Sequence, residues 1–140
     1  MKNSRILWIV LLMVSILATA CAPTAAPVAA AVDINNLPRD VDVDTVASLL
    51  GNEDVLILDV REQHEYDEGH IPGVVLIPVG EVPVRLDEIP MDKPVIVTCR
   101  SGNRSNQITL LLEETGYENV HNMLGGIVEW ESSGYDVVIP

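Results

Sequence analysis

The sequence predicts an α/β domain with a mostly parallel sheet and helices on both faces. Short runs rich in Val, Ile and Leu alternate with longer segments of mixed polarity between Val41 and Ser132, a pattern that is typical of such folds. The chain has 140 residues, enough for one domain with a substantial core. Because the chain contains no Phe, we expect that core to be aliphatic.

Residues 1–20 have the layout of a secretory signal peptide. Lys2 and Arg5 precede the apolar run Ile6–Leu17, which is shorter than the about 20 apolar residues of a spanning helix. Small residues then lead to Cys21, whose placing resembles the lipobox of a bacterial lipoprotein, although Ala replaces the usual Leu. We expect export and lipid anchoring at Cys21 to the bacterial cell membrane, facing outside the cytoplasm. An ordinary signal peptide and an uncleaved anchor are the alternatives.

An Ala- and Pro-rich segment follows and is expected to act as a tether over residues 21–40. Pro23 and Pro27 prevent a stable helix at its start, and its small side chains have little bulk to pack. The folded domain is therefore expected over residues 41–140.

The domain is expected to begin with an edge strand at Val41–Val43. Asp44 is a suitable N-cap for a helix over Thr45–Leu50, and Gly51 suits the position just after its end. The apolar run Val55–Asp59 is then expected to be a buried strand.

The middle of the domain alternates in the same way. Arg61–Glu68 is charged and predicts a short surface helix, and Gly69–Gly73 is a turn cluster. Val74–Ile77 predicts a third strand, which Pro78 ends, and Val82–Ile89 a short helix.

The last third contains the strongest patterns. Val95–Thr98 is a β-branched run and predicts the central strand, and Ser105–Thr115 has the apolar spacing of a helix. Val120–Leu124 and Ile127–Ser132 predict a final strand and helix.

A thiol, Cys99, stands between the central strand and the helix after it. Unpaired backbone N–H groups and the helix dipole favour an anion at such a place, and Arg100 and Arg104 add positive charge. We therefore expect a reactive sulfur with a lowered pKa, although a buried structural Cys is the alternative. The candidate nucleophile is Cys99, and the candidate binding residues are Arg100, Ser101, Gly102, Asn103 and Arg104.

Asp59 and Arg61 follow a second predicted strand. Ligand sites of parallel sheets lie at the carboxyl ends of strands, so this pair is expected near Cys99 in a supporting role. The alternative is that Asp59 caps a helix or merely pairs with Arg61.

Four motifs occur in order and together resemble the rhodanese-like sulfurtransferase domain. They are Leu58–Glu62, Gly69–Gly73, Cys99–Ser105 and Leu124–Trp130. The resemblance implies a rhodanese-like α/β fold in which Cys99 accepts a sulfane sulfur as a persulfide and passes it to a nucleophile. It also implies that the N–H groups of the loop, with Arg100 and Arg104, bind the anionic part of the donor.

The charge and residue types of the chain limit the kinds of molecule that it is expected to bind. The formal net charge of −13 argues against nucleic acid and anionic membrane surfaces. His64 and His121 have no partners at metal-ligand spacing, so neither a metal nor a cofactor is expected. We expect His70 to bond to the backbone and Trp130 to lie in the core.

Three functions remain open at this stage. A sulfurtransferase would use a donor such as thiosulfate and an outside thiol or cyanide as acceptor, because the folded region holds no second Cys. A non-catalytic sulfur carrier or binding module would have the same loop. A Cys-based phosphatase or arsenate reductase is disfavoured, since related phosphatases carry one residue more than the six from Cys99 to Arg104.

Overall fold

The computed structural model describes residues 32–140. The predicted signal peptide, the predicted lipidation site Cys21 and the first part of the predicted tether lie outside the described residues. No helix among residues 32–140 is both long enough and apolar enough to cross a membrane.

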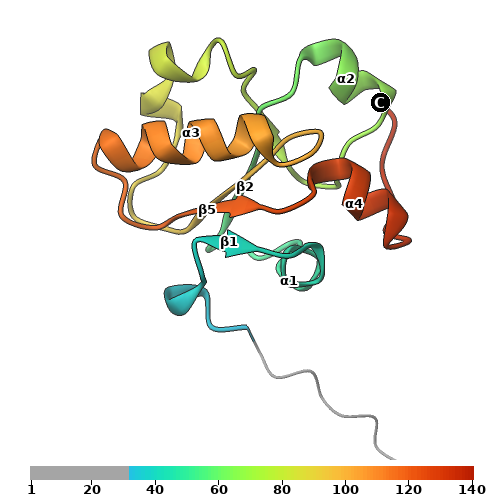
Figure 1. The fold of residues 1–140 in the computed structure, drawn as a ribbon, viewed down its shortest axis with the longest axis horizontal. Coiled ribbons are helices and arrows are strands. Elements are labelled where there is room, and N and C mark those ends of the chain that lie inside the picture. The colour runs from blue at the N-terminus through green and yellow to red at the C-terminus, as the bar shows by residue number, and fades with distance from the viewer. Residues whose placement is uncertain (1–31) are drawn as a thin grey trace, which may run out of the picture. The chain divides into compact units, whose positions relative to one another are not determined.

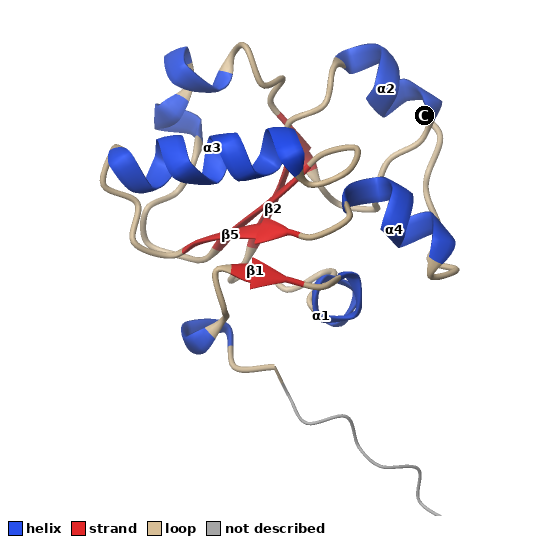
Figure 2. Ribbon diagram, viewed as in Figure 1, coloured by secondary structure: helices blue, strands red, loops and turns tan. Residues whose placement is uncertain are grey.

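A five-stranded, all-parallel sheet forms the centre of the domain (Figure 2). Its order is β1-β5-β4-β2-β3, so the strand that leads to the reactive thiol is the central one, as predicted. The expected α/β class with a parallel sheet is confirmed. The strands are β1 (Asp40–Val41), β2 (Leu56–Asp59), β3 (Val75–Leu76), β4 (Val95–Thr98) and β5 (Val120–Met123).

Helices lie on both sides of this sheet, with α3 on one side and α1 on the other in Figure 1. The α-helices are α1 (Val43–Ser48), α2 (Gln63–Glu68), α3 (Asn103–Glu114) and α4 (Gly126–Ser132). Short 3-10 helices occupy Ile34–Asn36, Val82–Val84 and Leu86–Glu88.

Two aliphatic clusters hold the layers together, one for each face of the sheet. Ile57 and Ile96 belong to the cluster that includes residues of α1 and α4, among them the buried Trp130. Leu58 and Val97, their neighbours along the strands, belong to the cluster that includes Leu112 of α3. Because successive strand residues point to opposite faces, a continuous apolar strand fills both clusters.

Two helices begin earlier than their sequence patterns predicted. Asp42, not Asp44, caps α1, because its carboxylate accepts a 2.8 Å hydrogen bond from the Thr45 N–H. The first strand is correspondingly shorter. Helix α3 begins at Asn103 rather than Ser105, so Arg104 lies in its first turn.

The helix predicted over Val82–Ile89 is wrong in type. Two 3-10 helices replace it, separated by Arg85, whose φ of −125° is not helical. Val82 and Ile89 are still buried in the cluster beneath α3. Pro83 lies in the first of these short helices, and packing of the segment against the core favours the tighter 3-10 backbone.

The last part of the predicted tether contacts the folded domain. Val32, Ile34 and Leu37 pack against the cluster that contains α1, and strand β1 begins at Asp40. Spaced apolar residues in an otherwise polar stretch give this segment something to bury, which the Ala- and Pro-rich part before it lacks.

Candidate active site

The sulfur of Cys99 lies immediately after the central strand β4 and is held by the start of α3. Cys99 is 1% exposed. The backbone N–H of Gly102 donates to its Sγ at 3.2 Å, and the Ser105 hydroxyl lies 3.4 Å from it. The strand end and the helix start thus meet at one sulfur atom, as the sequence predicted.

Helix α4 orients the loop that carries the sulfur. The N–H groups of Ile127 and Val128 donate to the carbonyls of Cys99 and Arg100, at 2.9 and 3.1 Å. A Cβ at Gly126 would collide with both of those carbonyl groups. Because the carbonyls face α4, the N–H groups of the loop are left to face the sulfur.

Gly102 makes the sharp turn into α3. Its φ of +92° is in the left-handed region, where other residues are strained. A Cβ there would also lie 3.3 Å from the backbone nitrogen of Gly125. Glycine at this position therefore permits both the bend into α3 and the close approach of the Gly125 backbone.

The surroundings favour the thiolate of Cys99. Burial raises its pKa, but hydrogen bonds from the hydroxyl and the backbone N–H of Ser105 lower it. The N–H groups of Ser101 and Gly102 lower it as well, and the net pKa lies below that of an ordinary thiol. Such a thiol is nucleophilic at neutral pH.

Arg104 is not a free guanidinium beside the sulfur. It donates two parallel hydrogen bonds of 2.7 Å to the carboxylate of Glu65 on α2. This bond to Glu65 is the main reason that the pKa of Arg104 is raised, and the charge of Cys99 raises it further. Arg104 therefore ties α3 to α2 while its charge still acts on the sulfur.

Glu65 itself is strongly acidic. The hydrogen bond from Arg104 lowers its pKa to about 2, with a smaller contribution from the backbone N–H of Glu62, although burial opposes both. Glu65 also completes the capping box at the start of α2. No local pattern in the sequence indicates that Glu65 pairs with Arg104, a residue 39 positions away.

The pair Asp59 and Arg61 is buried beside the site, with side chains 2% and 5% exposed. The shortest bond of the ion pair is 2.7 Å. The guanidinium also donates to the carbonyls of Glu65 and Gly69. Arg61 thus links the end of β2 to α2 and to the turn after it, and the supporting role of both residues stays a prediction.

The hollow beside the Cys99 loop has a volume of about 320 Å³. We call it the carboxyl-end hollow, since it follows strands β2, β4 and β5. Arg100 is exposed there and has no ion-pair partner among residues 32–140, whereas the side chains of Ser101 and Asn103 are exposed on the loop. The residues that line the carboxyl-end hollow are Arg61, Glu65, Glu68, Gly69, Arg100, Ile127, Val128 and Glu131.

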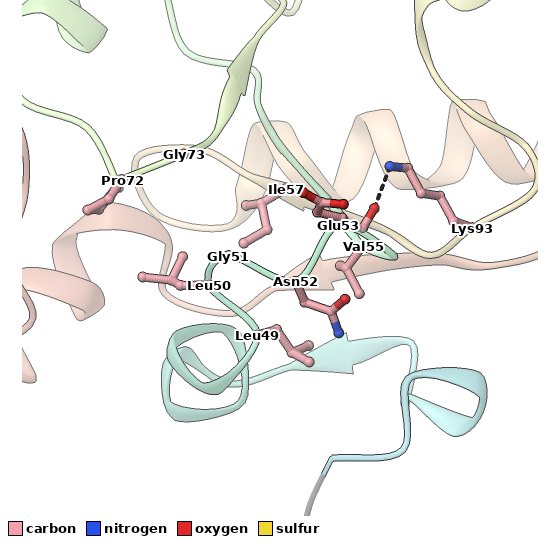
Figure 3. Close-up of a pocket in the computed structure, with 10 residues that line it drawn as sticks. All are labelled: Leu49, Leu50, Gly51, Asn52, Glu53, Val55, Ile57, Pro72, Gly73 and Lys93. Carbon is pink, nitrogen blue, oxygen red and sulfur yellow. Dashed lines mark hydrogen bonds between the residues drawn. The ribbon is translucent and has the colours of Figure 1, made fainter.

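A larger hollow of about 460 Å³ lies elsewhere, beside the starts of the strands (Figure 3). We call it the amino-end hollow. Leu49, Val55 and Ile57 give it apolar walls, and its cation, Lys93, donates to the carbonyl of Glu53 at 2.9 Å. It contains no thiol, imidazole or guanidinium group.

Two other residues considered in the sequence analysis, His70 and Trp130, contact the backbone or lie in the core. His70 contacts the carbonyl of Tyr66 at 3.1 Å, as predicted. Trp130 is 1% exposed, as predicted for a core residue. No cluster of three potential metal ligands occurs within residues 32–140.

The site residues predicted from the sequence did not include three polar residues that lie behind the sulfur. The Ser105 hydroxyl donates to the Oδ1 of Asn122 at 2.7 Å, and the amide of Asn122 donates to Asp40 at 3.0 Å. Ser105 directly follows the predicted loop and could have been suspected. The contact between Asn122 and Asp40 could not be predicted without knowing that β1 pairs with β5.

The fold and this site together define a class: parallel α/β domains that present a stabilised thiolate in an anion-binding loop. Residues 42–133 match the model of the rhodanese-like domain. The chain therefore belongs to the rhodanese-like family.

Known relatives agree with this assignment. The chain is 38% identical over 103 residues to a sulfurtransferase of Allochromatium vinosum, covering 73% of this chain and 96% of the relative. It is 33% identical over 95 residues to the thiosulfate sulfurtransferase GlpE of Pseudoalteromonas translucida, covering 68% and 90%. A rhodanese-related protein of Thermoplasma volcanium superposes with a TM-score of 0.67 at 30% identity, covering 74% and 100%. These relatives support a sulfurtransferase activity in the broad sense.

Proposed function

We propose that this protein moves a sulfane sulfur from a small anionic donor to a thiophilic acceptor through a persulfide on Cys99. The observation that carries the proposal is the Cys99 sulfur itself. It is buried, accepts hydrogen bonds at the start of α3, and has a lowered pKa. A thiolate that already exists needs no general base.

The proposed reaction has two displacements at sulfur. The Cys99 thiolate attacks the outer sulfur of the donor, a new Sγ–S bond forms, and the donor's S–S bond breaks. The leaving group, sulfite for thiosulfate, takes the electron pair. A cyanide or thiolate acceptor then attacks the outer sulfur, and the pair returns to Sγ. The N–H groups of the loop stabilise the anion at each stage without reorganising.

Arg100 is the residue that we propose for contact with the donor. Arg104 is occupied by Glu65, so Arg100 carries the available guanidinium in the carboxyl-end hollow. Glu68 and Glu131 line the same hollow and oppose a second negative charge on the donor. Two donors should therefore be compared: thiosulfate, which is a dianion, and a polysulfide, in which the negative charge is shared by more sulfur atoms.

Mass spectrometry after exposure to these donors tests the proposal. Wild-type protein should gain one sulfur on the peptide that contains Cys99 and lose it to cyanide or a small thiol, with thiocyanate or a persulfide as product. A folded protein that takes up no sulfur from either donor would exclude the proposal.

The same measurement, made over several turnovers, separates an enzyme from a carrier. An enzyme releases many equivalents of product for each Cys99, whereas a carrier releases one and then waits for a partner protein. Release of phosphate from an aryl phosphate without persulfide formation would favour the phosphatase alternative. The six-residue loop from Cys99 to Arg104 supports sulfur transfer over that alternative.

We further propose that the protein is exported and anchored by a lipid on Cys21. The support is the positive start, the apolar run and the small residues before Cys21. Membrane fractionation of Cys21→Ser is the test, with wild type alongside. The substituted protein should leave the membrane fraction or keep its uncleaved mass. A variant that stays in the membrane at the normal mature mass would exclude lipidation.

A further inference from the structure

A line of three polar side chains leads from the sulfur to the edge of the sheet. The Ser105 hydroxyl lies 3.4 Å from the Cys99 Sγ and 2.7 Å from the Asn122 Oδ1. The Asn122 Nδ2 then donates to the Asp40 carboxylate at 3.0 Å. Ser105 and Asn122 are 0% and 3% exposed, whereas Asp40 is at the surface.

The direction of these hydrogen bonds follows from the chemistry of the groups. A carboxylate only accepts, so Asp40 turns the amide of Asn122 to present its NH₂ group. The carbonyl oxygen of that amide then faces Ser105 and requires a donor. A hydroxyl has one hydrogen, so the Ser105 hydroxyl that donates to Asn122 can donate to the Cys99 thiolate only by giving up that hydrogen bond.

The geometry of the sheet places these residues together. Asp40 and Asn122 are paired residues of the parallel strands β1 and β5, so their side chains share a face. Ser105 is the third residue of α3, the helix that packs over β4 and β5. The edge strand, which follows the tether, is thereby connected to the sulfur.

We propose that Asp40 and Asn122 are positioning residues that hold the Ser105 hydroxyl hydrogen and limit how far it stabilises the Cys99 thiolate. This rests on the proposed sulfur transfer for its purpose but not for its test. In the persulfide, Sγ is a neutral, divalent sulfur and needs no donor, so the hydrogen lies on Asn122. In the thiolate, Sγ is the anion and competes for that hydrogen. Turning to Sγ leaves the buried Asn122 oxygen without a donor, which is unfavourable.

The charged groups around this line are few. Arg39 lies 3.6 Å from Asp40 and also pairs with Glu113 at 3.1 Å. On the sulfur side Arg104 acts on Cys99 by its charge, and Arg100 of the loop is exposed. Glu113 offers a matched control. Its surface carboxylate also pairs with Arg39, but within residues 32–140 it makes no hydrogen bond to Asn122.

The test is the substitution Asp40→Asn in the full chain. An amide at position 40 accepts or donates, so Asn122 is free to reverse and release the Ser105 hydroxyl to the sulfur. The rate of iodoacetamide alkylation is followed against pH, and mass spectrometry reads it on the Cys99 peptide so that Cys21 does not interfere. The profile should move to lower pH by about half a unit or more. Glu113→Gln should not move it.

A second background separates this effect from simple loss of charge. In Ser105→Ala, the additional change Asp40→Asn should leave the profile unmoved, because no hydroxyl is left to release. The proposal is overturned if Asp40→Asn shifts the profile equally with and without Ser105. It is also overturned if the substitution lowers the unfolding midpoint while the profile stays in place. Neither outcome depends on sulfur transfer, so failure here and failure of the proposed function are distinguishable.

Discussion

The amino-end hollow and the carboxyl-end hollow differ in chemistry more than in size. The amino-end hollow is the larger, at about 460 Å³ against about 320 Å³. Its lining includes the aliphatic residues Leu49, Val55 and Ile57, and its Lys93 is bound to a backbone carbonyl. The carboxyl-end hollow has guanidinium and carboxylate groups and borders the Cys99 loop. Volume alone would therefore select a hollow that does not border the Cys99 loop.

The difference has a structural cause. At the carboxyl ends of parallel strands the chain enters helices, whose first N–H groups are unpaired. The start of α3 brings such groups to the sulfur. At the amino ends the chain leaves helices, and the groups there are carbonyls, such as that of Glu53. An anion is stabilised at the first end and not at the second.

The largest effect is expected at the sulfur. Cys99→Ser should reduce sulfur transfer by about a thousandfold or more, because a hydroxyl stays protonated at neutral pH. Steady-state rates with thiosulfate and cyanide give the measurement. Cys21→Ser is the control and should keep the wild-type rate. Retained turnover in a folded Cys99→Ser protein would show that the carboxyl-end hollow is not the site.

The buried pair beneath this hollow should have the largest effect on stability. Arg61→Ala leaves the buried Asp59 carboxylate without its cation, which typically costs about 3–5 kcal/mol in the free energy of unfolding. Activity should fall with it, since Arg61 also holds the carbonyls of Glu65 and Gly69. Urea unfolding and steady-state rates are measured together.

Arg85 provides the matched control for Arg61. It pairs with Glu81 and Glu88 at the surface, where water and salt screen the charges, so Arg85→Ala should lower the unfolding midpoint much less than Arg61→Ala does. If Arg61→Ala lost activity at an unchanged unfolding midpoint, Arg61 would instead contact the substrate directly.

The next effect concerns donor binding. Arg100→Ala should raise KM for thiosulfate by about tenfold, the equivalent of one charge-assisted contact, with a smaller change in kcat. Its exposed position makes a change in stability of more than about 0.5 kcal/mol unexpected. Initial rates over a range of thiosulfate concentrations separate the two parameters. A kcat that fell with KM unchanged would place Arg100 in the chemical step.

The ion pair between α2 and α3 should show itself in the pH dependence of stability. Glu65 has a pKa of about 2 in the folded protein against 4.5 ordinarily. The unfolded chain therefore takes up the proton first, so the stabilisation is complete above about pH 5 and is lost as pH falls toward 2. Glu65→Gln should cost about 1 kcal/mol at neutral pH and flatten this part of the curve.

Glu68→Gln is the control for Glu65. Glu68 lines the same hollow but has no ion pair within residues 32–140, so its variant should keep the wild-type slope. Unfolding midpoints at intervals from pH 7 to pH 2 give the comparison. Equal slopes for wild type and Glu65→Gln would contradict the pairing with Arg104.

Local patterns in the sequence were enough to locate the thiol and its strand. Val95–Thr98 is predicted and observed as a strand with the same bounds. This prediction needed only neighbouring residues, because a β-branched run marks the strand and Cys99 and Gly102 follow its end. The start of α3 was placed two residues late, because the turn at Gly102 allows the helix to begin inside the loop.

Contacts between distant residues could not be predicted in this way. Glu65 and Arg104 are 39 positions apart, and Asp40 and Asn122 are 82 apart. Their meeting depends on the order of the strands and on which face each helix covers. From the sequence, both arginines of the loop were expected to bind the donor, whereas the position of α2 leaves Arg104 bound to the carboxylate of Glu65.

The smallest effect is expected at the amino-end hollow, and this makes it the sharpest test of the comparison. Lys93→Ala removes the hydrogen bond to Glu53, but the side chain is partly exposed and water replaces the lost partner. Stability should change by less than about 0.5 kcal/mol, and kcat and KM for sulfur transfer should stay within about twofold of wild type.

Both variants, Lys93→Ala and Arg100→Ala, remove one cation from the lining of a hollow, so they are compared in the same assay. Equal losses of activity would mean that overall charge, and not position at the carboxyl ends of the strands, determines donor binding. A loss with Arg100→Ala alone would assign donor binding to the carboxyl-end hollow, because the anionic donor must approach the sulfur where the free N–H groups are.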